Sequence, residues 1–357
     1  MKIGIVLHPY GEEKPAGLGR AIFEITRGLI EFDSKNEYVV FLRKRPKIPL
    51  GFKGQNWRIK IGDPKFFWLD RALRGENLDV CIFNTPIISF FVKPKKSIVI
   101  AYDFAYDNFS PDYLLKLYHR FSLKAADLII SISEATKKEI VSLFRIPCEK
   151  IMVIYLGYDK ICGFQPYPPP GLPEKFFLFV GAIKERKNVY GIVKAFSSLK
   201  SEKRVEPKLV LAGHGKGQYY EKIIRFVKEN GLSEKVIFLG QVSDGELSYL
   251  YRRAEALVYP SFIEGFGLPI LEAMSCGLPV ITSTVSSLPE VAGGAALLVD
   301  PYDTEAIAEA MVQIIGDPVL RERLIAAGYK QAEKFSWEKT AAELLYLISG
   351  KGYDRAV

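Results

Sequence analysis

The chain has 357 residues, of which 48% are hydrophobic and 25% charged, and its net charge is +8. This length predicts about two domains, and the composition is that of a globular protein rather than a disordered or fibrous one. No apolar run reaches the roughly 18 residues that a membrane-spanning helix needs.

The basic excess lies entirely in the first half of the chain. Residues 1–163 hold 26 Lys and Arg against 18 Asp and Glu, whereas residues 164–357 hold 23 of each. This asymmetry favours an anionic partner for the first half: a phospholipid surface, a lipid pyrophosphate acceptor or nucleic acid. A lysine-rich solvated face is the alternative interpretation.

The cysteines and the first residues bear on location. The segment Met1–His8 is too short for a signal peptide and is typical of a first strand. The four cysteines are scattered and contain no C-x-x-C pair: Cys81, Cys148, Cys162 and Cys276. The sequence therefore indicates neither a disulfide framework nor a zinc site, and a reducing cytoplasmic location is expected.

Apolar runs alternate with helical patterns along the first half. The runs that predict strands are 2–8, 37–43, 78–84, 97–102, 128–133 and 150–156. Helical periodicity predicts helices over 19–32, 111–126 and 134–144. Five prolines and two glycines then occur within 162–173, which predicts a linker at 164–173.

The same alternation resumes after the linker. Strands are predicted at 176–181, 208–213, 235–240, 256–260, 279–283 and 295–299. Helices are predicted at 188–200, 218–230, 244–254, 269–276, 303–316, 318–334 and 336–349. Such alternation predicts an α/β fold with two Rossmann-like, doubly wound parallel-sheet domains, 1–163 and 174–335, facing across a cleft. We expect the helix at 336–349 to pack back on the first domain.

Two carboxylates flank a glycine loop in the second half. Glu264 precedes Gly265-Phe266-Gly267, and Glu272 lies one turn inside the helix that Pro269 helps to start. The start of that helix offers unpaired N–H groups to a phosphate, and the carboxylates can accept hydrogen bonds from hydroxyls. This pattern predicts a ligand with both groups, such as a nucleotide sugar.

Two further segments suit phosphate binding. Arg186 and Lys187 stand just before a predicted helix, where cations oppose the helix dipole unless an anion is present. Gly17 and Gly19 form a short glycine loop after the first strand. Ile22 replaces the last glycine of G-x-G-x-x-G, which disfavours a dinucleotide dehydrogenase, and no P-loop occurs. The chain has no D-x-D pair, so a catalytic metal is not implied.

Together these motifs resemble the retaining glycosyltransferases of family four, which have the GT-B architecture. The resemblance covers nearly the whole chain and is strongest from Gly240 to Tyr251, from Tyr259 to Thr282 and from Ser287 to Pro301. The E-x7-E pair around Gly-Phe-Gly-Leu-Pro is the most specific motif. The pattern is most similar to the bacterial and archaeal mannosyltransferase branch.

The resemblance implies a role for each motif. It implies an acceptor-side first domain and a donor-binding second domain, with Glu264 by the donor sugar and Glu272 on the ribose. Arg186 and Lys187 would hold the diphosphate. The remaining donor contacts would come from Gly17, Gly19, Gln241, Val242, Phe266, Gly267 and Leu268.

The chain departs from the family after the predicted strand 97–102. The family usually has His-Asp there, whereas this chain has Tyr102-Asp103. A tyrosine can donate a hydrogen bond to a sugar hydroxyl, but it cannot act as a base near pH 7. Either Tyr102 substitutes as a donor, or the site is altered, or the enzyme is impaired. The residues expected to take part in catalysis are Glu264, Asp103, Tyr102, Arg186 and Lys187.

The resemblance implies a cytoplasmic retaining hexosyltransferase of polysaccharide biosynthesis. It would move mannose from GDP-mannose to a glycan or lipid-linked acceptor, without a metal or resident cofactor, and UDP-sugars are the next donors to consider. The basic first half suggests peripheral contact with an anionic membrane. The alternatives are a soluble enzyme that forms a small glycoside or sugar phosphate, and a non-catalytic nucleotide-sugar or nucleic-acid binder. Nucleic acid is not expected as a partner, because the second half, which carries the strongest motifs, is charge-neutral.

Overall fold

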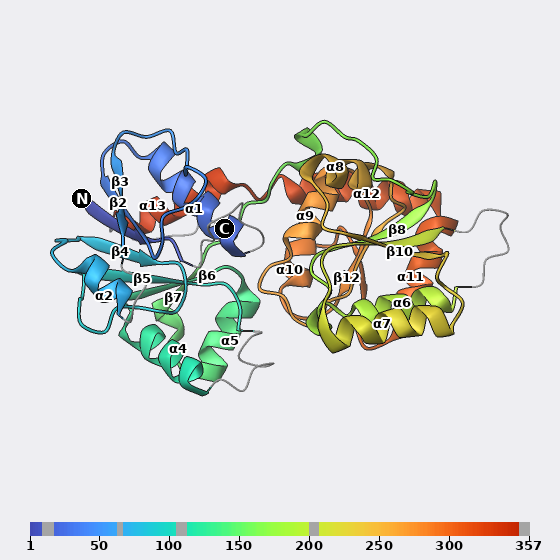
Figure 1. Cartoon of the computed structure of the whole chain (residues 1–357), viewed down its shortest axis with the longest axis horizontal. Coiled ribbons are helices and arrows are strands. Elements are labelled where there is room, and N and C mark those ends of the chain that lie inside the picture. Colours follow the sequence, from blue (N-terminus) through green and yellow to red (C-terminus); the bar gives the residue numbers. More distant parts are fainter. Residues whose placement is uncertain (9–17, 63–66, 105–112, 200–206, 350–357) are drawn as a thin grey trace. The chain divides into compact units, whose positions relative to one another are not determined.

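The computed structural model describes residues 1–8, 18–62, 67–104, 113–199 and 207–349 (Figure 1). The chain divides into two compact units. Unit 1 contains Met1–Gly157 and Phe335–Val357, and unit 2 contains Tyr158–Lys334. Among the described helices, none combines the length and the apolar composition that crossing a bilayer requires.

Unit 1 contains a seven-stranded parallel sheet in the order β3-β2-β1-β4-β5-β6-β7. Its strands are β1 Lys2–Val6, β2 Glu37–Leu42, β3 Trp57–Ile61, β4 Val80–Phe83, β5 Lys96–Ala101, β6 Leu128–Ser131 and β7 Ile151–Val153. Its described helices are α1 Leu18–Phe32, α2 Trp68–Leu73, α4 Tyr113–Ala125, α5 Glu134–Phe144 and α13 Trp337–Ile348. The central strands are buried on both faces, as a sheet covered by helices on each side requires.

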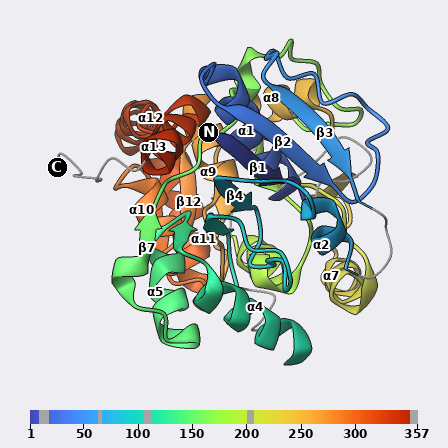
Figure 2. The same ribbon diagram turned by 90° about the vertical axis from the view of Figure 1, so that its left-hand side faces the viewer.

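The helices of unit 1 cover both faces of its sheet (Figures 1 and 2). On one face, alternate strand residues such as Phe83 and Val99 pack in one core with Leu73 of α2, Leu123 of α4 and Ile140 of α5. Helix α1 packs against α13. The last helix therefore belongs to unit 1, although the preceding 177 residues belong to unit 2.

Unit 2 contains a six-stranded parallel sheet in the order β10-β9-β8-β11-β12-β13. Its strands are β8 Phe176–Val180, β9 Lys208–Ala212, β10 Val236–Gly240, β11 Leu257–Tyr259, β12 Val280–Ser283 and β13 Leu297–Val299. Its helices are α6 Val189–Ser197, α7 Gly217–Glu229, α8 Asp244–Arg253, α9 Leu268–Ser275, α10 Leu288–Ala292, α11 Thr304–Gly316 and α12 Pro318–Ala332. Helix α11 packs on α6 and α12 packs on α9, so helices cover both faces of this sheet (Figure 1).

The chain leaves unit 1 beside the point where it returns. A Cβ on Gly157 would lie 2.1 Å from the backbone N of Trp337, so only glycine permits this contact. The Thr340 hydroxyl donates to the carbonyl of Tyr155 at 2.8 Å and ties the returning helix to the departing segment.

The boundary between the two units lies at 157/158, six residues before the predicted one at 163. Residues 158–163 belong to unit 2, and the proline-rich stretch is attached to α8 there. The Tyr167 N–H donates to the Gly245 carbonyl at 3.4 Å, and the Ser248 hydroxyl donates to the Phe164 carbonyl at 3.1 Å. Prolines exclude regular secondary structure from this stretch, but its remaining polar groups still bind the helix.

Candidate active site

The candidate site lies where the winding of the unit 2 sheet reverses direction. From β8 the chain crosses to β9 and β10 on one side, and it then returns to β11 on the other side of β8. Strands β8 and β11 are parallel neighbours, with Leu178 opposite Leu257. In open α/β sheets, ligands bind at the carboxyl ends of strands at such a reversal point. The segments after these two strands carry Arg186, Lys187 and Glu264.

Glu264 is the centre of a buried polar cluster. Its side chain is 8% exposed, and it accepts hydrogen bonds on both carboxylate oxygens. Oε1 accepts from Lys187 Nζ at 2.6 Å, from Tyr259 Oη at 2.8 Å and from Ser261 Oγ at 3.1 Å. Oε2 accepts from Arg186 Nη1 at 2.8 Å. The structure thus brings together three of the predicted residues and adds Tyr259 and Ser261, which the sequence reasoning missed.

The charges of this cluster fix its protonation. Burial alone would raise the pKa of Glu264, but the positive charges of Lys187 and then Arg186 outweigh burial and lower it to about 2. Burial and the adjacent Glu264 raise the pKa of Tyr259 well above its usual value. Tyr259 therefore stays a protonated donor, and Glu264 stays ionised over the physiological pH range. Two cations and one anion leave the cluster with a net charge of +1.

Backbone contacts hold the two site loops together. The Phe262 N–H donates to the Arg186 carbonyl at 2.8 Å, and Arg186 Nη1 donates back to the Ile263 carbonyl at 3.0 Å. The Glu264 N–H donates to Ser286 Oγ at 3.1 Å, and the Ser287 hydroxyl donates to the Glu264 carbonyl at 2.8 Å. These contacts fix the carboxylate relative to both strands.

Helix α9 begins directly after this cluster. Its N-cap, Gly267, has φ = +114°, and a Cβ there would lie 2.8 Å from Leu288 Cδ2. Glycine is therefore required both by the backbone conformation and by the close packing. Pro269 occupies the first turn, as the sequence predicts. Pro269 has no N–H, and the Ile270 N–H donates to the Gly267 carbonyl at 3.0 Å. The Leu268 N–H belongs to the turn that lacks carbonyl partners within the helix, so it can receive an anion.

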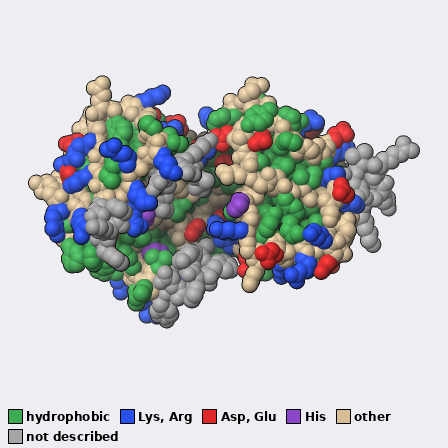
Figure 3. All heavy atoms as spheres, viewed as in Figure 1, with side chains coloured by type: hydrophobic (Ala, Val, Ile, Leu, Met, Phe, Trp, Pro, Cys, Tyr) green, Lys and Arg blue, Asp and Glu red, His purple; other side chains and the backbone are tan. Residues whose placement is uncertain are grey.

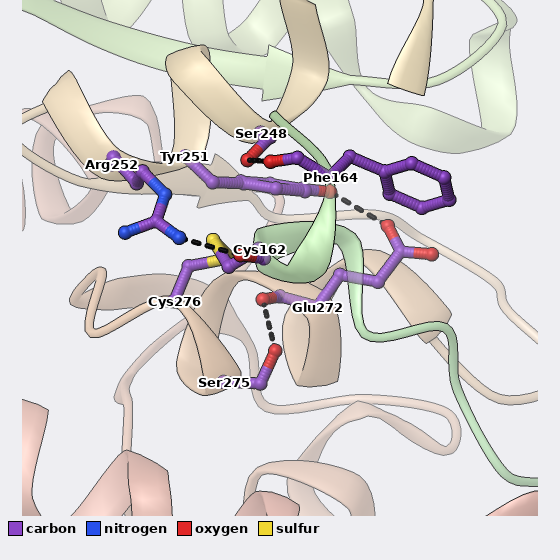
Figure 4. Close-up of a disulfide and its surroundings, with 8 residues drawn as sticks. All are labelled: Cys162, Phe164, Ser248, Tyr251, Arg252, Glu272, Ser275 and Cys276. Atoms are coloured by element: carbon purple, nitrogen blue, oxygen red, sulfur yellow. Dashed lines mark hydrogen bonds between the residues drawn. A yellow bond between two sulfur atoms is a disulfide. The ribbon is translucent and has the colours of Figure 1, made fainter. Parts of the chain in front are cut away.

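Glu272 lies one turn further along α9 and is half-buried. The Tyr251 hydroxyl donates to its Oε2 at 2.8 Å (Figure 4). Burial and the charge of Glu272 raise the pKa of Tyr251 well above its usual value, so this hydroxyl keeps its proton. Glu272 is therefore held in a fixed orientation by a residue of α8.

A disulfide joins Cys162 to Cys276, the residue that ends α9 (Figure 4). The prediction that the cysteines form no disulfide was wrong. These cysteines lie 114 positions apart, and only the packing of the segment 161–163 against α8 and α9 brings them together. Arg252 Nη2 donates to the Cys162 carbonyl at 2.5 Å and adds a second attachment. The expected reducing location rested on four unpaired cysteines, and two of them are paired in the structure.

The remaining predicted donor contacts are more dispersed. Gln241 and Val242 follow β10, and Gln241 is exposed. Gly17 lies outside the described residues. Gly19 lies within the first turn of α1 rather than in a loop, because that helix already begins at Leu18. Its N–H still belongs to the turn that lacks carbonyl partners within the helix.

Tyr102 and Asp103 follow β5 in unit 1. Tyr102 is 8% exposed, and its hydroxyl donates to Asn84 Oδ1 at 3.4 Å. Asp103 is exposed and lies near Glu139 of α5, which the sequence reasoning also missed. Burial and the charge of Asp103 raise the pKa of Glu139 to about 7. Two interacting carboxyl groups therefore lie where the sequence of this chain departs from the family pattern.

Two family models match the chain, one in each half. Residues 16–160 match Glycosyltransferase Family 4, and residues 168–331 match Glycosyl transferases group 1. The second model contains Arg186, Lys187, Glu264 and Glu272, so the buried cluster lies inside the matched region.

Two curated relatives are mannosyltransferases of Escherichia coli. The chain is 38% identical to O-antigen chain mannosyltransferase B over 243 residues, which are 65% of this chain and 63% of that protein. It is 32% identical to the serotype-specific mannosyltransferase WbdA over 244 residues, which are 66% of this chain and 30% of WbdA. The match thus spans less than two thirds of each relative.

A solved structure with the same fold is that of HepE from Anabaena in complex with UDP and glucose. Its TM-score is 0.77 at 18% identity, over 98% of this chain and 99% of that one. The fold class predicted from the sequence is confirmed. The chain thus consists of a Glycosyltransferase Family 4 region followed by a Glycosyl transferases group 1 region, and its fold is that of the GT-B glycosyltransferases.

Proposed function

We propose that the protein transfers mannose from GDP-mannose to a glycan or lipid-linked acceptor, with retention of anomeric configuration and without a metal. The observation that supports this most is the buried Glu264–Lys187–Arg186 cluster in front of α9, at the reversal point of the unit 2 sheet. The names of the two mannosyltransferase relatives support the choice of sugar.

The cluster suits the diphosphate of such a donor. Its net charge of +1 and the start of α9 both attract an anion. Arg186 offers a planar fork of N–H donors and Lys187 a compact charge. A phosphate that approaches them competes with Glu264 for the same N–H groups. These groups stabilise the charge that develops as the diphosphate leaves.

Glu272 would bind the ribose hydroxyls, because Tyr251 already orients its carboxylate. Gln241 and Val242 would contact the base from the end of β10. The main-chain N–H groups of Gly267 and Leu268 would lie by the sugar and phosphate.

Glu264 serves in this proposal as a positioning residue. A carboxylate with a pKa of about 2 is a poor base. A nucleophilic role would also require it to give up its bonds to Lys187 and Tyr259. We therefore favour attack of the acceptor on the same face of the sugar, with the departing phosphate taking the acceptor proton. Glu264 then fixes the two cations at that phosphate.

A thermal-shift panel of GDP, UDP, ADP and dTDP tests the donor site. The proposal expects GDP to raise the melting temperature most, because saturation at about 100 Kd stabilises a protein by roughly 2.7 kcal/mol. A shift with UDP alone would replace the donor by a UDP-sugar, and no shift with any of them would refute the site.

Transfer from radiolabelled GDP-mannose to extracted glycolipid tests the reaction. Lys187→Ala and Glu264→Ala should each lower turnover about a hundredfold or more, while Lys228→Ala, an exposed lysine of α7, should not. Product anomer analysis by NMR tests retention. Transfer only to a water-soluble acceptor would favour the small-glycoside alternative. Failure to release nucleoside diphosphate from any donor would favour a non-catalytic binder.

A further inference from the structure

A band of exposed apolar side chains lies on unit 1. It is formed by the residue before α2, the loop after β4 and the outer side of α4. We call it the apolar face, and it consists of Phe67, Phe90, Phe91, Leu114, Leu117 and Phe121. These side chains are between 43% and 79% exposed. Single exposed apolar residues are ordinary, whereas a contiguous band marks a surface that another apolar body covers.

The members of the apolar face are in mutual contact. The ring centroid of Phe91 lies 5.6 Å from that of Phe67 and 6.4 Å from that of Phe90. The Phe90 ring stacks on Phe121 at 5.1 Å. Leu114, Leu117 and Phe121 follow one another at helical spacing along α4, so they form one stripe. The face is therefore continuous from α2 to the first turn of α4.

A buried carboxylate holds the loop that displays Phe90 and Phe91. Asp70 of α2 is 5% exposed, and its Oδ1 accepts from Ser89 Oγ at 2.5 Å and from the Phe91 N–H at 2.8 Å. The Val92 N–H then donates to Ser89 Oγ at 2.9 Å. The hydrogen bonds of this loop thus hold Phe90 and Phe91 exposed to solvent.

Positive charge surrounds the apolar face. The three segments that build it, 67–74, 87–96 and 113–125, contain eight Lys and Arg and one Asp. That single Asp is the buried Asp70, so these segments carry a net charge of +7 (8 − 1) in the sequence. Lys95 of this set is paired with Asp79 of a neighbouring segment at 2.7 Å. Lys93, Arg120 and Lys124 are exposed. Figure 3 shows hydrophobic side chains at the lower left of unit 1 with Lys and Arg side chains beside them.

We propose that the apolar face is a docking surface for an anionic lipid bilayer, with Phe91, Leu114 and Leu117 inserted among the lipids. A bilayer with acidic headgroups offers apolar depth and negative charge side by side, which is the combination this surface presents. The proposal uses residues of unit 1 alone and does not depend on the transfer reaction.

Nucleic acid fits the same surface less well. Proteins bind single strands by stacking bases on exposed aromatic faces. Here the Phe90 ring is stacked on Tyr118 with an interplanar angle of 10° and on Phe121 with one of 23°. The Phe90 ring is thus already stacked within the face, and the most exposed side chain, Leu114, has no ring to stack.

Vesicle flotation of the full chain tests the proposal. We expect binding to phosphatidylcholine vesicles that contain about a third phosphatidylglycerol, weakened by salt, and little binding to phosphatidylcholine alone. Phe91→Ser/Leu114→Ser and Lys93→Glu/Arg120→Glu should each lower the bound fraction about tenfold or more. The matched controls, Val312→Ser/Val319→Ser and Arg225→Glu/Lys228→Glu, alter exposed residues of unit 2 and should bind as the wild type does.

The proposal would be overturned if the control variants lost as much vesicle binding as the apolar-face variants, or if the apolar-face variants bound as the wild type does. Salt-sensitive RNA binding without vesicle binding would do the same. If the serine variant fails to fold, a tryptophan placed in the apolar face gives a second test, because it keeps the face apolar. Phe91→Trp should show blue-shifted fluorescence with anionic vesicles and quenching by acyl-chain bromines, whereas Val319→Trp should show neither. Unchanged Phe91→Trp emission would refute insertion.

Discussion

Lys187 and Glu264 lie 77 positions apart in the chain, yet their side chains meet at 2.6 Å in the interior of unit 2. Each residue follows one of two adjacent strands, β8 and β11, so the order of strands in the sheet brings them together. The carboxylate is the shared acceptor for both cations of the site. The charges needed for a diphosphate are thus held in place before any ligand arrives.

Lys187→Met should destabilise unit 2 by about 3–5 kcal/mol, because removing one member of a buried ion pair leaves its partner uncompensated. Urea unfolding followed by fluorescence measures this change. Arg186 still contacts Glu264, which places the loss toward the lower end of that range.

Two variants give this measurement its controls. Lys187→Met/Glu264→Gln removes both charges and should lose less stability than the sum of the single variants, since the members of a pair are not additive. Arg321→Met disrupts the more exposed pair with Glu255 and should cost less than Lys187→Met. If Lys187→Met lowers the free energy of unfolding no more than Arg321→Met does, the ion pairs of Glu264 are not buried.

Tyr251→Phe should weaken donor binding while leaving the chemical step largely intact. The variant removes the hydrogen bond that orients Glu272, and a bond of this kind contributes about 1–2 kcal/mol. We expect the donor KM and the Kd for the nucleoside diphosphate to rise several-fold and kcat to change little. Tyr249→Phe removes a hydroxyl from the same helix and should leave KM unchanged. An unaltered donor KM in Tyr251→Phe would show that Glu272 does not bind the ribose.

Much of the fold could be predicted because the strands of a doubly covered parallel sheet are short apolar runs. The run at 176–181 corresponds to β8, and the run at 97–102 to β5, each within one residue. Strand β3, Trp57–Ile61, was missed because it is an edge strand: Arg58, Ile59 and Ile61 are exposed, and charges interrupt its apolar pattern. An apolar pattern interrupted in this way leaves too weak a signal in one sequence to be separated from a loop.

The site was predictable in its members but not in its contacts. The glycine loop and Pro269 indicated an anion-binding helix start from local rules alone. The pairing of Glu264 with Lys187, and the donors Tyr259 and Ser261, depend on strand order and loop conformation, which local spacing does not specify. Glu139 could not be found from the sequence either, because its pKa depends on burial and on Asp103 from another segment.

The disulfide should stabilise the protein strongly. It closes a loop of 114 positions, for which the chain-entropy model gives roughly 4–5 kcal/mol. A reductant should lower the melting temperature of the wild type but not that of Cys162→Ser/Cys276→Ser. Alkylation of the unfolded, unreduced protein should modify two thiols, Cys81 and Cys148, and four after reduction. Cys148→Ser, which removes an exposed free thiol and leaves the disulfide in place, serves as the control. Four reactive thiols before reduction would show that the bond is absent.

Glu139→Gln should stabilise the protein at pH 8 but not at pH 5. The pKa of Glu139 is raised in the folded state to about 7, so folding favours the protonated carboxyl. That contribution is fully present below the unfolded pKa of about 4.3 and is lost as pH rises through the folded pKa. The melting temperature of the wild type should therefore fall between pH 5 and pH 8 relative to that of Glu139→Gln. Glu149→Gln, an exposed change nearby, should run parallel to the wild type across this range. A constant difference between wild type and Glu139→Gln at all pH values would show that the pKa of Glu139 is not raised in the folded protein.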